Sequence, residues 1–360
     1  MSIIENFVAY ISIFAGYTKY STLRGDPRIA RILGQYRIRT ELVSAAYADS
    51  TWDQIISALN TFELFASETS TTIVWPFSED ILCNFIHWAT FSRKLSPNTV
   101  ISYMSSLKLI HSLRGMKTSV FKSFLCKTQI RGAQNLAFYN GKAKSNKKVF
   151  TLPLIRIMGH EIAKSDWSDH SKSVVWCAAL VAFFGSFRFG ELVSKSENVY
   201  SEHETLLWKD IQFFDDNSIR IHNKVPKNRT KNGEFISLFE FEGKSCCPIK
   251  AIKCLKELSK KSGSESYPVF TFSNGKFLTC KRMNELIIHF LKPHLNDEAY
   301  SYSCKSFRAG LPSALAAYPN LENDVHIKRW GRWNSNAYER YTRLSHKAKK
   351  AIFKKFISVL

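Results

Sequence analysis

The sequence predicts a mainly α-helical protein with a small β-hairpin or sheet, an α+β fold in about two domains. A chain of 360 residues is too long for one ordinary core, and its 45% of hydrophobic residues is enough to fill sizeable cores. Apolar residues recur at helical spacing through most of the chain, and they alternate at period two near residues 219–239. The β structure is therefore expected in the second half.

The net charge points to a polyanionic partner. The chain has 51 lysines and arginines against 30 aspartates and glutamates, which gives +21 at pH 7. Such an excess favours nucleic acid, here double-stranded DNA, as the partner. The positive charge is concentrated at the end of the chain, where residues 328–360 hold ten lysines or arginines and one acid, Glu339.

The first half of the chain predicts a helical bundle. Residues 1–35 are expected to form an N-terminal arm or extra helices, and residues 36–140 a helical domain. Its helices are predicted from Thr51, after the cap Ser78, from Ser96-Pro97, and over 119–130. Polar faces of this bundle carry bases that we expect to contact DNA, rather than only water, among them Lys94, Lys108 and Arg114.

A basic stretch separates the two predicted domains. Residues 140–148 are polar and lack large apolar side chains, so 141–150 is predicted to be a linker. Its lysines are expected to contact DNA phosphates: Lys144, Lys147 and Lys148. The same run is compatible with a nuclear import signal, a motif with many false matches. We therefore expect a nuclear protein if the host is a eukaryote, and a cytoplasmic one otherwise.

The second domain, residues 151–345, has a mixed pattern. Helices are predicted at about 152–164, 172–194, 248–261, 279–292, 304–317, 323–332 and 335–342. Between them, 219–222 and 234–239 alternate around a turn-forming stretch and predict a β-hairpin. The tail, residues 346–360, predicts a basic amphipathic helix.

Several classes of protein are excluded. The longest apolar run, 174–187, is short for a membrane span, and the N-terminus lacks the basic start of a secretory signal. None of the eight cysteines forms a Cys-x-x-Cys pair, so reduced thiols in an intracellular protein are expected. Nothing completes a tetrahedral site around Cys246, Cys247 and Cys254, so we expect no metal.

Two arginine motifs are candidates for phosphate binding. Arg188 follows the apolar run, and a guanidinium buried there needs an anion, because its desolvation is costly. Glu191 is one candidate anion, and a bound phosphate held beside Glu191 is the other. Lys305 and Arg308 lie three residues apart and project from one helical face, either as surface bases or toward an acidic partner.

Two further segments have groups that suit attack on a phosphodiester. The hairpin carries Lys224, Lys227, Arg229 and Lys231, and Lys227, at the end of the first strand, is the favoured proton donor. We expect Arg229 and Lys231 to contact DNA. Residues 330–343 place Tyr338 and Tyr341 on one helical face beside arginines that can stabilise charge on a phosphate. The alternative is that both tyrosines are packing aromatics.

These motifs follow one another in a recognisable order. Arg188-x-Gly-Glu precedes the hairpin lysine, which is followed by Arg308-Ala-Gly, by Gly331-x-Trp333 and by Tyr341-x-Arg343. The ordered set, over about residues 36–345, resembles the tyrosine recombinase (phage integrase) family. Its Gly331–Arg343 segment is most similar to recombinases of eukaryotic mobile elements of the Crypton and DIRS type.

The resemblance implies a helical core-binding (SAM-like) domain and a catalytic domain that close as a clamp around duplex DNA. It also implies a homo-oligomer on DNA, a dimer to a tetramer. The implied roles are phosphate clamping by Arg188 and Arg308, protonation of the 5′ oxygen by Lys227, hydrogen bonding and packing at the phosphate by Trp333, and nucleophilic attack by Tyr341. The product would be a 3′-phosphotyrosine, and no metal or other cofactor is implied.

The expected function is site-specific DNA recombination or transposon integration. One residue departs from the family pattern, because Lys305 stands where the family usually has His. A lysine still donates a hydrogen bond to phosphate, but it is not a neutral base near pH 7 unless its pKa is lowered. Two alternatives stay open: a catalytically degenerate DNA-binding protein with the same fold, and a type IB topoisomerase-like enzyme.

Overall fold

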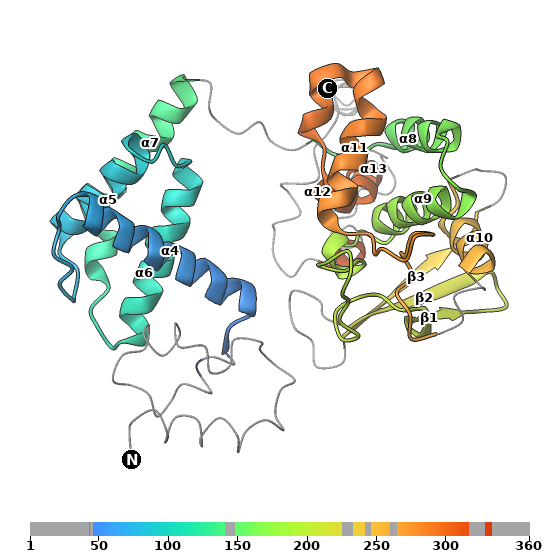
Figure 1. The fold of residues 1–360 in the computed structure, drawn as a ribbon, viewed down its shortest axis with the longest axis horizontal. Coiled ribbons are helices and arrows are strands. Elements are labelled where there is room, and N and C mark those ends of the chain that lie inside the picture. The colour runs from blue at the N-terminus through green and yellow to red at the C-terminus, as the bar shows by residue number, and fades with distance from the viewer. Residues whose placement is uncertain are drawn as a thin grey trace, which may run out of the picture. The chain divides into compact units, whose positions relative to one another are not determined.

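The computed structural model describes residue 43 and residues 46–140, 148–224, 233–241, 246–259, 265–316 and 328–332. The chain divides into two compact units, Met1–Lys144 and Ser145–Leu360, so the division falls inside the predicted linker (Figure 1). The predicted N-terminal arm, 1–35, and the predicted C-terminal helix, 346–360, lie outside the described residues. None of the helices among the described residues is both long and apolar enough to span a lipid bilayer.

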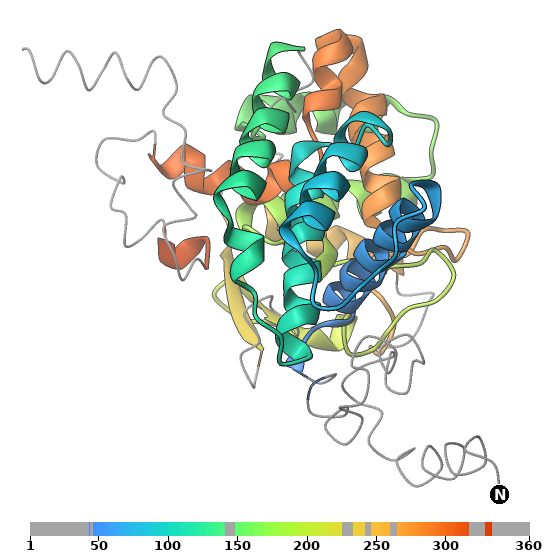
Figure 2. The same cartoon turned by 90° about the vertical axis from the view of Figure 1, so that its left-hand side faces the viewer.

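The first unit is a helical bundle (Figure 2). Its described elements are α4 (Asp49–Glu68), α5 (Glu79–Phe91), α6 (Pro97–Leu113), a short 3₁₀ helix (Ser119–Lys122) and α7 (Phe124–Tyr139). The predicted caps are confirmed, because the Ser78 hydroxyl accepts from the Ile81 amide and the Ser96 hydroxyl from the Thr99 amide. These caps satisfy amides that have no partner within the helix.

The single helix predicted over 119–130 is wrong. The 3₁₀ helix ends at Lys122, and the Ser123 hydroxyl then caps α7 by accepting from the Cys126 amide. The new helix continues to Tyr139. Only Cys126 and Ala133 of α7 are buried, so the apolar spacing gave little signal for its second half.

The core of the first unit is aromatic. Trp52, Phe62, Phe65 and Phe85 are among the largest completely buried side chains, and the Phe62 ring stacks on Phe77 with centroids 4.4 Å apart. Such pairs contribute about 0.5–1.5 kcal/mol of stability beyond the contribution of the apolar area that they bury. This unit therefore has a core independent of the second unit.

A buried histidine completes this core. The Phe77 amide donates to Nε2 of His111 at 3.0 Å, and Nδ1 of His111 lies 3.1 Å from the Leu107 carbonyl oxygen. Nε2 is thus an acceptor and Nδ1 a donor, which is the neutral imidazole. Burial lowers the pKa of His111 below its ordinary value, because water is absent around the charged form.

The stability of the first unit should therefore fall in mild acid. Below a pH of about 6.5 the unfolded chain binds a proton that the native His111 excludes, so the free energy of unfolding drops by at most about 1.4 kcal/mol for each pH unit. His111→Gln keeps an acceptor for the Phe77 amide but does not titrate. Urea unfolding at about pH 7.5 and about pH 5.5 should show a smaller pH effect in this variant than in the parent. An equal pH effect in both proteins would contradict the assignment.

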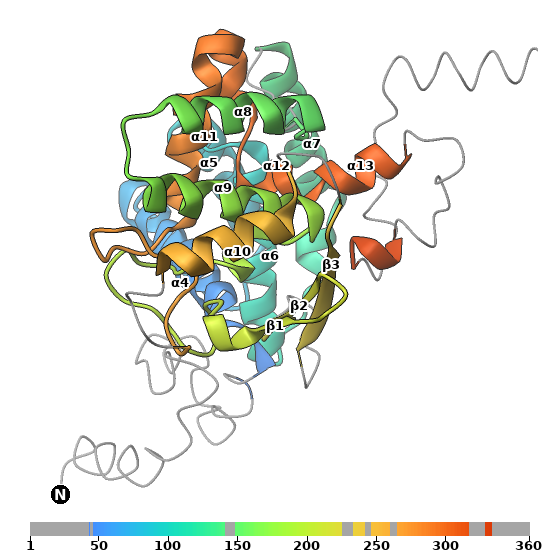
Figure 3. The ribbon, with the colours of Figure 1, turned by 90° about the vertical axis from the view of Figure 1, so that its right-hand side faces the viewer.

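The second unit combines helices with one small sheet. Its described elements are α8 (Leu152–Lys164), α9 (Asp169–Phe184), β1 (Ile211–Phe213), β2 (Ser218–Asn223), β3 (Glu234–Phe239), α10 (Pro248–Ser259), α11 (Cys280–Leu295), α12 (Cys304–Arg308) and α13 (Gly310–Ala316), with short 3₁₀ helices at Phe189–Glu191, Trp208–Asp210 and Asn296–Ser301. Figure 3 shows α10 packed between the sheet and α9, with α8 on the other side of α9.

The sheet is antiparallel, in the order β1-β2-β3. The predicted hairpin strands are confirmed, and the register pairs Ile219 with Leu238 and Ile221 with Ile236. These four side chains are buried, and they alternate with more exposed residues on β3. Strand β1 was not predicted, because three residues are too few for a period-two pattern.

The helix predicted over 172–194 is wrong at its end. Helix α9 stops at Phe184, with Gly185 as its cap, and Ser186 has a φ of 47°, in the left-handed region. A Cβ at Gly185 would lie 2.4 Å from the Phe187 ring, so only glycine fits this close turn. The turn places Arg188 at the residue immediately before a 3₁₀ helix, Phe189–Glu191, instead of on α9. Similarly, the helix predicted over 304–317 is divided at Ala309 into α12 and α13.

Candidate functional site

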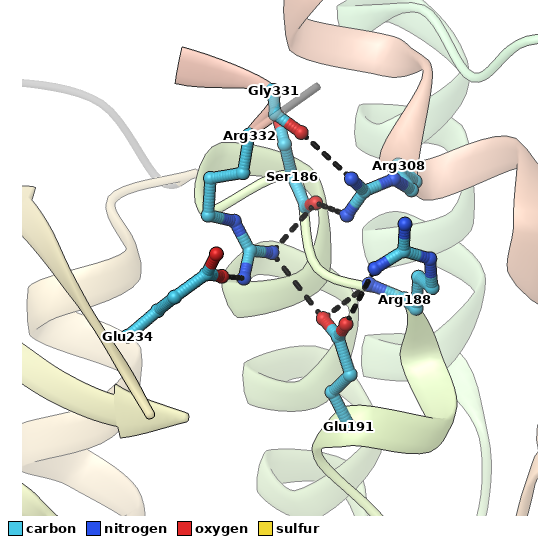
Figure 4. A network of polar contacts seen from close by, with 7 residues as sticks. All are labelled: Ser186, Arg188, Glu191, Glu234, Arg308, Gly331 and Arg332. Carbon is cyan, nitrogen blue, oxygen red and sulfur yellow. Dashed lines mark hydrogen bonds and ion pairs between the residues drawn. The ribbon is translucent and has the colours of Figure 1, made fainter. Parts of the chain in front are cut away.

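Three segments that are distant in the sequence meet at one polar network (Figure 4). They are the turn from Ser186 to Glu191, the helix α12 that carries Arg308, and the described residues 328–332. The structure therefore brings together Arg188 and Arg308, the two arginines that the sequence singled out.

Arg188 is held by Glu191. The Arg188 amide donates to Oε2 of Glu191 at 3.0 Å, and Nη1 of Arg188 donates to Oε1 at 2.9 Å. The Glu191 side chain is only 6% exposed, whereas that of Arg188 is 33% exposed. The expected ionic partner is thus present, and part of the Arg188 guanidinium remains accessible from solvent.

Arg308 is held differently. Its side chain is buried, and Nη1 and Nη2 donate to the carbonyl oxygens of Ser186 and Gly331, each at 2.7 Å. Carbonyl groups orient a guanidinium without cancelling its positive charge. The contact with Gly331 also ties α12 to the segment that immediately precedes Trp333.

A third arginine, Arg332, joins the network and was missed in the sequence. Its Nη1 donates to Glu234 at 3.0 Å, and its Nη2 lies 3.1 Å from the Ser186 carbonyl oxygen and 3.3 Å from Oε2 of Glu191. The side chain is 12% exposed and its Cζ lies 4.9 Å from the centre of the Phe187 ring. Arg332 therefore links the turn from Ser186 to Glu191 with β3 of the sheet.

Positive groups gather in this network. The guanidiniums of Arg188, Arg308 and Arg332 lie together with the carboxylates of Glu191 and Glu234. The Arg188 side chain is 33% exposed, so an anion can approach its guanidinium from solvent. A phosphate group suits such a site, because its oxygens accept several guanidinium hydrogen bonds.

The other predicted catalytic residues are placed in part. Lys305 is exposed on α12, one helical turn before Arg308. Lys224, the residue just after β2, donates from Nζ to Oδ2 of Asp210 and to the Glu202 carbonyl oxygen, both at 2.6 Å. Five predicted residues and the second tyrosine, Tyr338, lie outside the described part of the chain. The five are Lys227, Arg229, Lys231, Trp333 and Tyr341.

The predicted DNA-contacting bases have different surroundings. Lys94 is exposed and Lys108 half-buried, whereas the Arg114 guanidinium lies 4.0 Å from the centre of the Trp75 ring, and burial lowers the pKa of Arg114. Lys148 forms an ion pair with Glu298 at 2.7 Å. Lys144 and Lys147 lie outside the described residues. DNA contact by these bases stays a prediction.

The packing of Phe150 also matters for the predicted linker. Its ring stacks on Phe307 with centroids 4.3 Å apart, and its amide donates to the Ser306 carbonyl oxygen. The end of the 141–150 stretch thus packs directly under α12, the helix that carries Arg308. Among the described residues, no group of three or more histidines, cysteines or acids is arranged to hold a metal ion.

Removing the Arg332 side chain should destabilise the second unit. Arg332→Ala leaves Glu191 and Glu234 without their shared partner, and loss of one member of a buried ion pair costs about 3–5 kcal/mol. Arg329→Ala removes an exposed arginine from the same segment and should change stability by less than about 0.5 kcal/mol. Urea unfolding of both variants measures the difference. Equal stabilities would show that the Arg332 contacts contribute nothing.

Two solved structures have a similar fold. The site-specific recombinase XerH, bound to palindromic difH substrate in a post-cleavage complex, has a TM-score of 0.58 at 13% identity, over 98% of this chain and 93% of that one. The Tn1549 transposon integrase, in complex with circular intermediate DNA, has a TM-score of 0.55 at 14% identity, over 98% of this chain and 99% of that one.

Comparisons of sequence give no such likeness, since no family model and no curated protein matches the chain. At these identities the structural likeness concerns the backbone, and it agrees with the mostly helical architecture and the three-stranded antiparallel sheet. The predicted fold class is thereby confirmed, and the chain has the fold of the tyrosine recombinases and integrases.

Proposed function

We propose that this protein cuts and rejoins DNA as a site-specific recombinase or transposon integrase, through a covalent tyrosyl-phosphate. The observation that carries the proposal is the network in which Arg188 and Arg308 meet, with the Arg188 side chain partly exposed. A phosphodiester is the anion that best fits this network. The net charge of +21 supports DNA as the source of that phosphate.

The likeness of fold supports the same substrate class. XerH and the Tn1549 integrase were both solved with DNA. We propose that the two units of this chain close around duplex DNA as a clamp, and that two to four copies assemble on paired sites. The resemblance of Gly331–Arg343 to Crypton and DIRS recombinases favours a mobile-element enzyme, and therefore a nuclear one if the host is a eukaryote.

The chemistry follows from the charges. Arg188 and Arg308 would bind the two non-bridging oxygens of the scissile phosphate and stabilise the charge that these oxygens gain in the transition state. The Tyr341 oxygen would attack phosphorus, and Lys227 would give a proton to the leaving 5′ oxygen. Lys305 would donate a hydrogen bond to the phosphate from the exposed side of α12.

The placement of Lys224 supports Lys227 as the acid. Lys224 is mostly buried and its Nζ already donates to Asp210 and to the Glu202 carbonyl oxygen. A proton donor must reach the leaving oxygen, within hydrogen-bonding distance. Lys224 would first have to break a buried ion pair, which costs several kcal/mol. We therefore retain Lys227 over Lys224 in this role.

A second candidate is a protein that binds DNA without cutting it. The observation that favours it is the buried state of Arg308, whose two terminal nitrogens already donate to backbone carbonyl oxygens. The atypical Lys305 points the same way. The two candidates differ in one respect that can be measured, which is formation of a covalent bond between protein and DNA.

The covalent product should be detected with nicked DNA. Tiled duplexes from the DNA that flanks the gene supply the test sites, each nicked beyond the expected cleavage point so that the short 5′-hydroxyl fragment diffuses away. The parent should then form an adduct of the 41.3 kDa chain with labelled DNA on a denaturing gel, also in the presence of a chelator. Arg188→Ala should lower the rate about 10²- to 10³-fold.

Two phenylalanine variants serve as a matched pair. Tyr341→Phe removes only the hydroxyl group, so DNA binding should persist while the adduct disappears. Tyr338→Phe removes the hydroxyl of the other candidate on the same predicted face and should leave the adduct intact. Loss of the adduct with Tyr338→Phe alone would show that the nucleophile is misassigned. Binding by the parent without an adduct on any fragment would support the non-cutting candidate.

A further inference from the structure

One ion pair connects the sheet to the arginine network. Glu234 is the first residue of β3, and its Oε2 accepts from Nη1 of Arg332 at 3.0 Å. The register of the sheet pairs Glu234 with Asn223, the last residue of β2. Glu234 therefore stands where the two strands enter the 224–233 connection, which includes Lys227.

The other end of the same guanidinium contacts the turn from Ser186 to Glu191. Nη2 of Arg332 lies 3.1 Å from the Ser186 carbonyl oxygen and 3.3 Å from Oε2 of Glu191, the carboxylate that also holds Arg188. A guanidinium is planar and rigid, so groups bound to its two terminal nitrogens cannot move independently. Arg332 thus fixes the base of the hairpin relative to Arg188.

We propose that Glu234 is a positioning residue for the acid step. Through Arg332 it fixes the base of the hairpin, where β2 and β3 end, relative to Arg188, and proton delivery by Lys227 depends on that fixed base. This inference rests on the proposed function, and it adds that proton delivery depends on a carboxylate that touches neither the DNA nor the reacting atoms. The pair is mostly shielded from water, with side-chain exposures of 12% for Arg332 and 23% for Glu234.

The bonds of the step define a selective test. The Tyr341 oxygen loses its proton to water and bonds to phosphorus, the bond from phosphorus to the 5′ oxygen breaks, and that oxygen takes a proton from the Lys227 ammonium group. A bridging 5′ sulfur changes only the last event. A thiol has a pKa of about 8.5, so a thiolate leaves without a proton. A loss of cleavage rate that is caused by a defective acid step should therefore be absent with the sulfur substrate.

The experiment compares single-turnover cleavage of two duplexes, identical except for oxygen or sulfur at the bridging 5′ position. Their sequence is that of a flanking fragment cleaved by the parent. Glu234→Gln keeps the size of the side chain and removes its charge. Its rate should fall about 10²-fold on the oxygen substrate, as expected for a small misplacement of a catalytic group. On the sulfur substrate, Glu234→Gln should cleave at close to the parent rate. Lys227→Ala should also cleave the sulfur substrate at close to the parent rate.

The control variant is Glu240→Gln. Glu240 follows the other end of β3, has a similar side-chain exposure of 22%, and pairs with Lys250 and Lys253 instead of Arg332. It should react like the parent on both substrates.

A second variant, Arg332→Lys, keeps the positive charge but lacks the planar guanidinium whose two terminal nitrogens bind Glu234 and the Ser186–Glu191 turn together. It should be slow on both substrates, because it also releases the segment that leads to Tyr341.

Each outcome gives a definite answer. Equal slowing of Glu234→Gln on the two substrates would overturn the positioning role while leaving the proposed function intact, and so would a parent-like rate on the oxygen substrate. If Arg332→Lys cleaves both substrates at the parent rate, the guanidinium of Arg332 is not needed, and the proposed link from Glu234 through Arg332 is overturned. If the parent cleaves no flanking fragment, the proposed function fails, and the inference fails with it.

Discussion

The carbonyl oxygen of Ser186 is the point on which the site depends. It accepts from Nη1 of Arg308 at 2.7 Å and from Nη2 of Arg332 at 3.1 Å, so one backbone atom joins two segments distant in the sequence. The left-handed conformation of Ser186, with a φ of 47°, ends α9 and starts the turn to Arg188. The fold therefore adopts an unfavourable backbone conformation at the place where the arginines meet.

Around that point the arginines differ in freedom. Arg308 and Arg332 are mostly buried and fixed by carbonyl or carboxylate oxygens, whereas Arg188 is partly exposed. A site built in this way has two guanidiniums that are already fixed by the protein, and a third that is open to solvent. Fixed charges of this kind are effective in catalysis because they are already oriented before the reaction begins. The same order is the reason for our proposal that Glu234, a carboxylate remote from the phosphate, influences the acid step.

The sequence predicted the parts of the site that are local. An arginine after a long apolar run had to be partly buried, and Glu191 at three residues' distance was its natural partner, which the structure confirms. Arg332 could not be found in this way, because its role depends on contacts with Ser186, Glu191 and Glu234 that only the fold creates. The end of α9 was misjudged for a related reason: Phe187 and Phe189 continue the apolar pattern beyond the turn at Gly185.

The central claim is that Arg188 neutralises the charge of a phosphodiester, and charge-neutral DNA tests it most directly. A methyl group in place of one non-bridging oxygen removes the negative charge of the scissile phosphate. Arg188→Ala, slowed about 10²- to 10³-fold on ordinary DNA, should react nearly as fast as the parent on the methylphosphonate. The same slowing on both substrates would show that Arg188 does not act on the phosphate charge, and would contradict the account.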